Sequence, residues 1–324
     1  MKIKPHLAGY VGGPGLYQMP ADVYHADCAP EPSLSSSIAR TLLEASPQHA
    51  WIAHPRLGCQ VEAERDPSRP KEIGTVAHKL ILGQGSDVVL IDADDYRSAA
   101  AKAQRAQAYA DGHCPILQPD ADKADALADQ VAEKLALIPG CEGFTKAPAE
   151  VVAVAQDRSG AWLRIMMDRV EIHPTHAIIW DVKTGDQSAA PQLLGRRVES
   201  MQMEVQAALY VHVLSMLLPH LAGRIRFRWI FVENEFPHAL SVAEADGAGM
   251  EIGARKVAAA IHVWNRCRAA GEWPGYPAQI VRFDYPEWAA RRWSEREELD
   301  PQLSGVSYDI AQSPFRPLDM ESAA

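Results

Sequence analysis

Asp168, Asp181 and Lys183 are the residues of this chain whose types and spacing are best suited to chemistry. Asp181 and Lys183 lie two positions apart, so on a β-strand both side chains leave the same face. The apolar run at 178–180 leads directly into them, which would place two opposite charges at the end of a buried strand. Buried charges are usually paired or metal-bound, and carboxylate oxygens suit Mg²⁺ or Mn²⁺. Taken alone, the Asp-Val-Lys triplet is more often a surface ion pair on a hairpin.

Three strands are predicted around these residues, and a third acid, Glu150, opens the first of them. The predicted strands are Glu150 to Ala155, Ala161 to Ile172 and Ala177 to Thr184. Runs of β-branched and aromatic residues, separated by Gly, Pro, Asp and Ser, are typical of such hairpins. The interval between Asp168 and Asp181 fits two adjacent strands and a short turn. This arrangement can place both acids at one edge of the sheet.

A helix is predicted over residues 71–82, because apolar residues recur there at helical spacing and Gly83 is a natural stop. His78 lies in this helix. An imidazole can ligate or approach a metal ion, although a histidine on such a helix is more often part of the core. Gly74 would let the helix begin in close contact with its neighbour.

A longer, mostly helical stretch is predicted from Pro191 to Leu218, where Gln206 and Tyr210 lie one turn apart on the same face. The alternative is an ordinary amphipathic helix with Tyr210 in the core. Residues 1–32 are rich in Gly, Pro and Tyr and are expected to form an irregular arm. Other helices are predicted near Ile38, over 95–111, 119–139 and 250–270, and in a short Trp- and Arg-rich segment before residue 294.

Length and composition place the chain among soluble globular proteins. It has 324 residues, 47% hydrophobic and 23% charged, which allows about two domains. No run of about 18 apolar residues is present, so no membrane span is expected. Five widely spaced cysteines without a CxxC pair favour neither a disulfide framework nor a zinc site, and they fit a reduced, cytoplasmic setting.

The net charge of −10 argues against a protein coated for non-specific nucleic-acid binding, but it leaves room for a local basic groove. Two sets of arginines are candidates for such a groove. One is the pair Arg196 and Arg197, and the other is the predicted strand at 224–233, where Arg224, Arg226 and Arg228 alternate with apolar residues. The simpler interpretation is that this face of the strand is exposed to solvent. The alternative is that its arginines contact phosphates.

Five motifs in a fixed order carry a family resemblance. They are Tyr24 with Leu34-Ser35-Ser36-Ser37 and Ser46-Pro47-Gln48-His49, then Gly74-Thr75 with His78, then Asp168 with Asp181-Val182-Lys183-Thr184, then Gln206 to Tyr210, and finally Trp273-Pro274-Gly275-Tyr276. In these features the chain resembles the PD-(D/E)XK nuclease superfamily and its RecB-like exonucleases. The nearer resemblance is to the C-terminal nuclease domain of exonuclease VIII (RecE) and its phage relatives. Met167 departs from the pattern, since many members have Pro before the first Asp.

The resemblance implies an α/β fold with a mixed central sheet flanked by helices. The implied domains are an N-terminal arm and helical extension at 1–68, a nuclease core at 69–299 and a disordered tail at 300–324. It also implies a site for Mg²⁺ or Mn²⁺. The implied metal ligands are Asp168, Asp181, the Val182 carbonyl, Glu150 and His78, with Lys183 acting on the attacking water and with Gln206 and Tyr210 holding DNA or the lysine.

The activity implied by the resemblance is metal-dependent degradation of linear double-stranded DNA from the 5′ end, which exposes 3′ single strands for recombination. A ring-shaped homo-oligomer and a single-strand annealing protein are the implied partners, with no membrane. An iron–sulfur cluster is not expected, because one downstream cysteine, Cys267, cannot replace the three such clusters use in related nucleases. A metal-dependent endonuclease and a catalytically silent DNA-binding scaffold remain open as alternatives.

Overall fold

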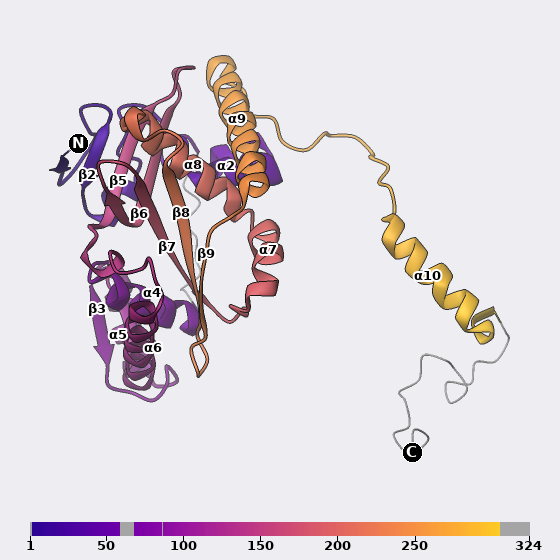
Figure 1. Ribbon diagram of the computed structural model, residues 1–324. Helices are drawn as coiled ribbons and strands as arrows, with labels where there is room; N and C mark the ends of the chain where they lie inside the picture. Colours follow the sequence, from indigo (N-terminus) through magenta and orange to yellow (C-terminus); the bar gives the residue numbers. More distant parts are fainter. Residues whose placement is uncertain (1, 59–67, 86, 305–324) are drawn as a thin grey trace. The chain divides into compact units, whose positions relative to one another are not determined.

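The computed structural model describes residues 2–58, 68–85 and 87–304, so Cys59 and residues 305–324 of the predicted tail lie outside the described part. The chain divides into two units, Met1–Gly275 and Tyr276–Ala324, which are described separately. The first unit holds a seven-stranded sheet with helices on both faces (Figure 1).

The central sheet is mixed, as predicted, with strand order β1-β2-β5-β6-β7-β8-β9. Its strands are β1 (Ile3–Pro5), β2 (Gly15–Gln18), β5 (Ala149–Gln156), β6 (Trp162–Ile172), β7 (Ala177–Gly185), β8 (Ile225–Glu233) and β9 (Leu240–Ala243). The β1–β2 and β7–β8 pairs are parallel and the others antiparallel. The three strands predicted around the acids are present to within a residue or so.

The core lies on both faces of the sheet. One layer contains α2 (Ser36–Glu44), α3 (Pro47–Ala53), α7 (Pro191–Ser200), α8 (Met203–Leu217) and α9 (Gly247–Ala270). The other contains α4 (Arg69–Leu82), α5 (Ala99–Ala110) and α6 (Gln118–Leu137), with a small parallel pair, β3 (Val88–Ile91) and β4 (Cys114–Leu117). β7 is buried on both faces because it lies between the two layers. Central strands of this kind read as continuous apolar runs.

Helix boundaries follow ordinary capping rules. The Ser35 hydroxyl accepts from the Ile38 amide at the start of α2, which satisfies one of the free amides of the first turn. Gly83 ends α4 in the left-handed conformation, at φ +68°, as the sequence predicted. The mostly helical stretch predicted over 191–218 consists of two helices, α7 and α8. Gln202 is left-handed at φ +50° between them, which redirects the chain into α8.

The expectation of an irregular N-terminal arm is wrong for part of the segment. β1 and β2 join the central sheet, and β2 pairs with β5, where Leu16 lies opposite Ala153. A short helix, α1 (Ala21–His25), follows. Backbone pairing uses amides and carbonyls that do not depend on the side chain, proline's missing amide excepted, so a Gly- and Pro-rich stretch can pair at the edge of a sheet without a strong strand pattern.

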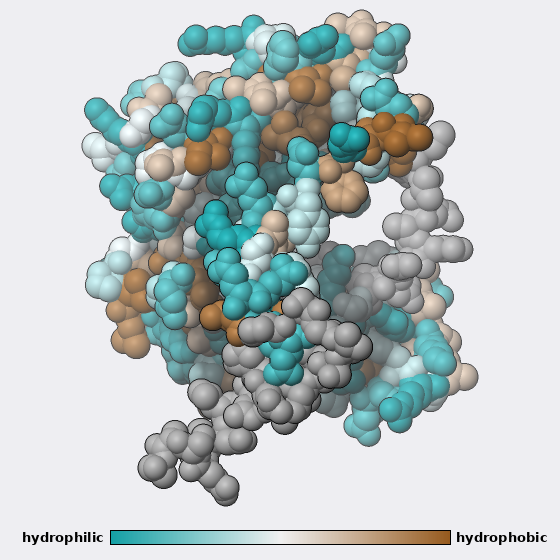
Figure 2. Space-filling model, turned by 90° about the vertical axis from the view of Figure 1, so that its right-hand side faces the viewer, coloured by the Kyte–Doolittle hydropathy of each residue, from teal (hydrophilic) through white to brown (hydrophobic). Residues whose placement is uncertain are grey.

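The second unit contains α10 (Glu287–Leu299), the predicted Trp- and Arg-rich helix, and a 3₁₀ turn, Pro301–Ser304. In the described residues no helix is long and apolar enough to cross a membrane. The face drawn in Figure 2 is largely hydrophilic, with hydrophobic residues gathered in separate places.

Close packing of α8 on α9 depends on Gly253. A Cβ at this position would lie 2.4 Å from the backbone carbonyl oxygen of Glu204. We therefore expect Gly253→Ala to lower the free energy of unfolding by about 1–3 kcal/mol, because backbone must move to admit the methyl group. Gly195→Ala in α7 is the matched control, since its Cβ would meet nothing within 4 Å. It should raise stability by roughly 0.5–1 kcal/mol. Urea unfolding measures both, and equal effects would contradict the packing argument.

Candidate active site

The candidate site lies where β6 and β7 stop pairing. Their register runs from Ile172 opposite Ala177 to Arg169 opposite Trp180 and ends there. One step further, the Oδ2 atom of Asp168 accepts a hydrogen bond from the Val182 backbone amide at 2.6 Å. The Asp168 carboxylate thus accepts a hydrogen bond where a backbone carbonyl would be the acceptor if the pairing of β6 and β7 continued. The two strands separate at this point and leave room between them for side chains.

Asp181 lies in this opening and is 2% exposed. Lys183 Nζ lies 2.7 Å from its Oδ2, so the same-face arrangement expected from the spacing is present. The Gln206 amide, which reaches over from α8, donates to Oδ1 of Asp181 at 2.7 Å. Both oxygens of a buried carboxylate therefore have polar neighbours from two different elements.

His78 enters the site from α4. Its Nε2 lies 3.1 Å from Oδ2 of Asp168, whose side chain is 15% exposed. α4 comes close to β7 at Gly74, where a Cβ would lie 3.3 Å from the Thr184 hydroxyl oxygen. The contact expected at this glycine is thus present, and a larger residue there would need its neighbour to give way.

Glu150 lies beside these groups at an irregular point of the sheet. Ala149 pairs with Arg169 and Val151 with Met167, but Glu150 has φ +50°. A non-glycine residue in the left-handed region is uncommon and costs free energy. Glu150 and His78 line a cavity of about 590 Å³ that adjoins the acids.

Tyr210 is a core residue that also lines the site. Its ring packs edge-on against Phe227 at 5.7 Å between centroids, and its side chain faces the cavity that holds Asp168 and Asp181. Burial raises the pKa of Tyr210 well above its ordinary value, with a smaller contribution from Tyr24. The hydroxyl therefore stays protonated at neutral pH. Tyr210 is therefore part of the core and also part of the lining of the site.

The two acids have opposite pKa shifts. Burial raises the pKa of Asp181 to about 6; Lys183 opposes the shift, while the Asp168 carboxylate adds to it. For Asp168, burial also acts upward, but the His78 ring, Lys183 and the Val182 amide outweigh it and lower the pKa. Burial would lower the pKa of His78, yet Asp168 outweighs it and raises the pKa. The pair thus has one firmly ionised member and one that takes up a proton close to neutrality.

The predicted metal ligands are brought near one another without forming a ready-made cluster. Among the described residues, no group of three or more His, Cys, Asp or Glu side chains is arranged to hold an ion. Asp168 and Asp181 line one cavity, Glu150 lines the next, and His78 lines both. The set of five ligands stays a prediction.

Sequence reasoning missed a group of polar residues that line the same cavity, which holds about 360 Å³. Arg164 lies on β6 four positions before Asp168, so both project from one face. Three serines at the start of α2 also line this cavity, namely Ser35, Ser36 and Ser37. The i, i+4 relation of Arg164 to Asp168 was the signal that could have identified it.

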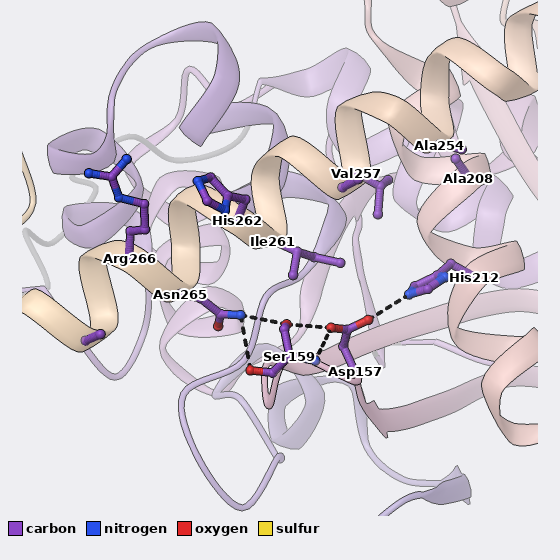
Figure 3. A pocket seen from close by; sticks show the side chains of 12 residues that line it. Asp157, Ser159, Ala208, His212, Ala254, Val257, Ile261, His262, Asn265 and Arg266 are labelled. Atoms are coloured by element: carbon purple, nitrogen blue, oxygen red, sulfur yellow. Dashed lines mark hydrogen bonds and ion pairs between the residues drawn. The ribbon is translucent and has the colours of Figure 1, made fainter.

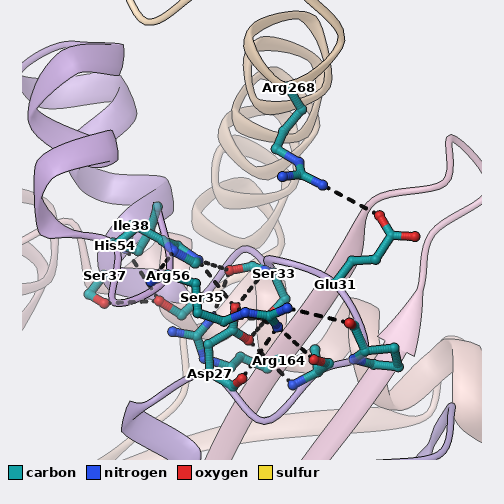
Figure 4. Close-up of polar contacts among 12 residues, drawn as sticks. Asp27, Glu31, Ser33, Ser35, Ser37, Ile38, His54, Arg56, Arg164 and Arg268 are labelled. Carbon is teal, nitrogen blue, oxygen red and sulfur yellow. Dashed lines mark hydrogen bonds and ion pairs between the residues drawn. The ribbon is translucent and has the colours of Figure 1, made fainter. Parts of the chain in front are cut away.

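Arg164 is held by a buried network around Asp27 (Figure 4). Asp27 is 1% exposed and lies 3.1 Å from the Arg164 guanidinium, and it accepts from the Ser33 hydroxyl. Arg164 in turn donates to the Ser33 carbonyl at 2.7 Å. Burial, and then the Arg164 charge, lower the pKa of His54 to about 4, so this nearby imidazole is neutral. Asp27 compensates the guanidinium and fixes the chain that leads into α2.

A second pocket, of about 600 Å³, lies between α9 and the turn that joins β5 to β6 (Figure 3). It contains Ser159, Asp157 and His212, the residue types of a hydrolytic triad. However, Ser159 donates to Asp157, and the His212 ring contacts the other oxygen of Asp157 at 3.3 Å. The carboxylate lies between hydroxyl and imidazole, so the histidine has no hydrogen bond through which to take the serine proton. This arrangement does not suit acyl-transfer chemistry.

Three of the arginines suggested for phosphate contact have other partners. Arg197 is 8% exposed and its guanidinium lies 4.8 Å from the Phe231 ring centroid. Arg226 and Arg228 both pair with Glu244. The expectation that Arg197 forms part of an open basic wall is therefore wrong, because its side chain is buried. The two arginines on β8 share one acid, which follows β9.

Comparisons with known proteins agree with this geometry. The family model of the PD-(D/E)XK nuclease superfamily matches residues 33–303. No curated protein matches this chain. Among solved structures, a "Putative exonuclease" from Eubacterium rectale is similar in fold, at 10% identity and a TM-score of 0.53, over 84% of this chain and 98% of that one. A second solved structure, SSO0001, has 12% identity over 59% of this chain and 86% of that one, with a TM-score of 0.24. With the family model covering most of the chain, and with Asp168, Asp181 and Lys183 gathered where β6 and β7 part, this chain belongs to the PD-(D/E)XK nuclease superfamily.

Proposed function

We propose that this protein is a metal-dependent exonuclease that degrades linear double-stranded DNA, from 5′ to 3′, and exposes 3′ single strands for recombination. The observation that carries the proposal is the contact of Asp181 with Lys183 beside Asp168, in an opening between two strands. Membership of the nuclease superfamily supports hydrolysis of DNA. The polarity and the role in recombination rest on the resemblance to RecE-type enzymes.

The residues present fit a hard divalent cation such as Mg²⁺ or Mn²⁺. Asp181 is buried and its pKa is raised to about 6, so its carboxylate is under-compensated by Lys183 alone. A cation near it would offset this cost, and oxygen ligands suit Mg²⁺. Asp168, Asp181 and the Val182 carbonyl would hold the ion, with His78 and Glu150 on the side facing the neighbouring cavity. When bound, the ion would polarise the scissile phosphate and favour ionisation of a water molecule.

The protein's own groups divide the remaining work. Lys183 lies next to the acids and would orient the attacking water or balance charge developing on the phosphate. Gln206 holds Asp181 through Oδ1 and so fixes its orientation. Tyr210, protonated and buried, shapes the wall of the cavity. Arg164 and the serines at the start of α2 line the same cavity as the acids and would suit phosphate oxygens, since guanidinium groups and helix N-termini both favour anions.

We extend the proposal to the assembly and its partners. A ring-shaped homo-oligomer would keep an acidic chain on its DNA by enclosure and would not need a basic surface. A single-strand annealing protein would receive the 3′ strand. Both ideas come from the family resemblance and from the net charge of −10.

The first test of the site is Lys183→Ala. We expect a loss of DNA cleavage of at least about 100-fold, because the group beside the reacting phosphate is gone, while the fold remains. Lys102→Ala on α5 is the matched control, since Lys102 is exposed and lies on another element. Release of nucleotides from end-labelled linear duplex with Mg²⁺ measures both. Full activity of Lys183→Ala would remove this lysine from the site, and a protein inactive with both Mg²⁺ and Mn²⁺ would instead be a DNA-binding scaffold.

The second test concerns stability without metal. The pKa of Asp181 is raised from 3.8 to about 6, so between these values the folded protein binds a proton more readily than the unfolded chain. Stability then falls as pH rises through this window. At pH 8, without metal, Asp181→Asn should be more stable than the parent by about 1–2 kcal/mol. The raised pKa of Asp181 corresponds to a cost of about 3 kcal/mol that the variant removes, and the loss of the partner of Lys183 offsets part of this gain.

The gain should shrink as pH falls through this window and approach zero below about pH 3, where the carboxyl is neutral in both states. Denaturant unfolding in a chelator at pH 4.5 and pH 8 measures it. Asp92→Asn, at an exposed position, is the control and should show no such trend. A variant less stable than the parent at pH 8 would show that the Asp181–Lys183 pair is net stabilising.

The third test is the need for a DNA end. Covalently closed circular duplex should survive Mg²⁺ conditions that consume the same DNA after linearisation. The physical reason is that a cavity of about 360 Å³ walled by α2 and the sheet suits one terminal strand better than an uninterrupted duplex. Gel analysis of matched circular and linear DNA measures this. Equal rates on both would assign the protein as an endonuclease and leave the metal site in place.

A further inference from the structure

Arg169 directly follows Asp168 on β6 and is a buried cation. Its side chain belongs to a residue that is 9% exposed. Burial lowers the pKa of its guanidinium, and no acid among the described residues opposes this shift. A buried charge without a charged partner is costly, and an apolar side chain of similar size would avoid this cost. The guanidinium is therefore expected to have a specific task.

The guanidinium of Arg169 bridges two segments of the chain. One of its nitrogens donates to the Leu82 carbonyl at 2.7 Å, and another donates to the Ala147 carbonyl at 2.6 Å. The centroid of the Phe144 ring lies 5.1 Å from the guanidinium carbon. Leu82 is the last residue of α4. The arginine thus binds the C-terminal end of this helix, where carbonyls lack partners within the helix and attract cations.

Asp168 and Arg169 reach the same helix although they are neighbours on a strand. Neighbouring strand residues normally leave opposite faces of the sheet. Here Met167 and Val170 both belong to the core cluster that contains α8, so the alternation of β6 shifts by one residue between them. The two residues inside this interval both contact α4, Asp168 at His78 and Arg169 at the end of the helix.

The neighbouring strand, β5, changes face at the paired position. Ala149 lies opposite Arg169. Val151 lies opposite Met167. By alternation Ala149 and Val151 would share a face, but they belong to core clusters on opposite sides of the sheet. Glu150, between them, has φ +50°. Both strands therefore turn together, which keeps their pairing and directs an acid and the next cation toward one helix.

The two contacts with α4 lie one helical turn apart. The His78 ring is 3.1 Å from Asp168, and the Leu82 carbonyl belongs to a residue four positions further on, about 6 Å along the helix axis. A single contact at His78 would leave the end of the helix free to shift against β6. The second contact, from Arg169, fixes that end and with it the position of the imidazole.

The first half of α4 is held by other groups. Glu72 is 2% exposed and accepts hydrogen bonds from Arg105 and Tyr109 on α5. These contacts do not involve Arg169, so the helix should stay folded and attached without it. Loss of the guanidinium should therefore act on the second half of α4, which carries His78.

We propose that Arg169 is a positioning residue that holds His78 against Asp168 and thereby sets the affinity of the candidate site for a divalent cation. The inference rests on the proposed function, in which His78 and Asp168 help to hold the ion. Arg169 is not among the described residues that line the two cavities, so it acts through His78 and does not touch the cation or DNA. Residues that orient metal ligands in this way commonly change metal affinity about 10–100-fold when they are replaced.

Titration of the metal-free protein with Mn²⁺ tests this role, with free Mn²⁺ measured by electron paramagnetic resonance. Arg169→Met should raise the Kd for Mn²⁺ about 10–100-fold. Arg197→Met is the matched control and should leave the Kd unchanged. Arg197 is likewise buried, lies against a phenylalanine ring and donates to a backbone carbonyl, but it belongs to α7. Circular dichroism verifies the fold of both variants. If Arg169→Met does not fold, Arg169→Lys replaces it, because an ammonium group lacks the fork that bridges two carbonyls.

A double-mutant cycle with His78→Ala separates positioning from a general loss of stability. If Arg169 acts through His78, Arg169→Met should weaken Mn²⁺ binding in the parent but not in the His78→Ala background. A residue that only stabilises the fold would lower the affinity by the same factor in both backgrounds.

An unchanged Kd for Arg169→Met, the same loss with and without His78, or an equal loss in Arg197→Met would overturn the inference and leave the proposed nuclease function in place. A parent protein that binds no Mn²⁺ would instead overturn the metal-dependent function, and the role of Arg169 with it.

Discussion

Compensation of buried charge is the constraint on which this structure depends. Asp181 lies in the middle of β7, within its buried part, and a carboxylate there is costly without partners. Lys183, two residues on, and Gln206, from α8, supply them. The Asp168 carboxylate has the Val182 amide and the His78 ring as its polar partners. The central hairpin and helices on opposite faces of the sheet are thus tied to one polar centre, and moving any of them would leave a charge exposed to apolar surroundings.

The same requirement explains the N-terminal segment. Arg164 is 3% exposed on the face of β6 that carries Asp168, and a buried guanidinium also needs an opposite charge. Asp27 provides it from a segment far away in sequence, together with Ser33. Asp27 itself has φ +69°, a conformation that costs free energy and persists where surrounding contacts fix it. The start of α2 is therefore positioned by electrostatics as much as by apolar packing.

Strong local patterns made the central part of the fold predictable. The strands around Asp168 and Asp181 and the helix with His78 follow from alternation, helical spacing and the stop at Gly83. β1 and β2 escaped prediction because they are held by backbone pairing with little side-chain pattern. The break at Gln202 depends on a left-handed residue that no glycine announces. Arg164 was missed because its partner Asp27 is distant in sequence, so nothing local shows that the guanidinium is buried.

The distribution of positive charge reconciles an acidic chain with a polyanionic substrate. On β8, Arg226 and Arg228 share the carboxylate of Glu244, and the cavity that holds Lys183 also holds Arg164. The adjoining cavity shares His78 with it and is lined by Lys71 and Lys79. Both cavities therefore combine cations that can contact phosphates with the acids proposed to hold a metal ion. Affinity for phosphates rises with the number of cations that contact them, so this short row of cations would favour binding of a phosphate backbone at the cavities, which suits the exonuclease activity proposed above.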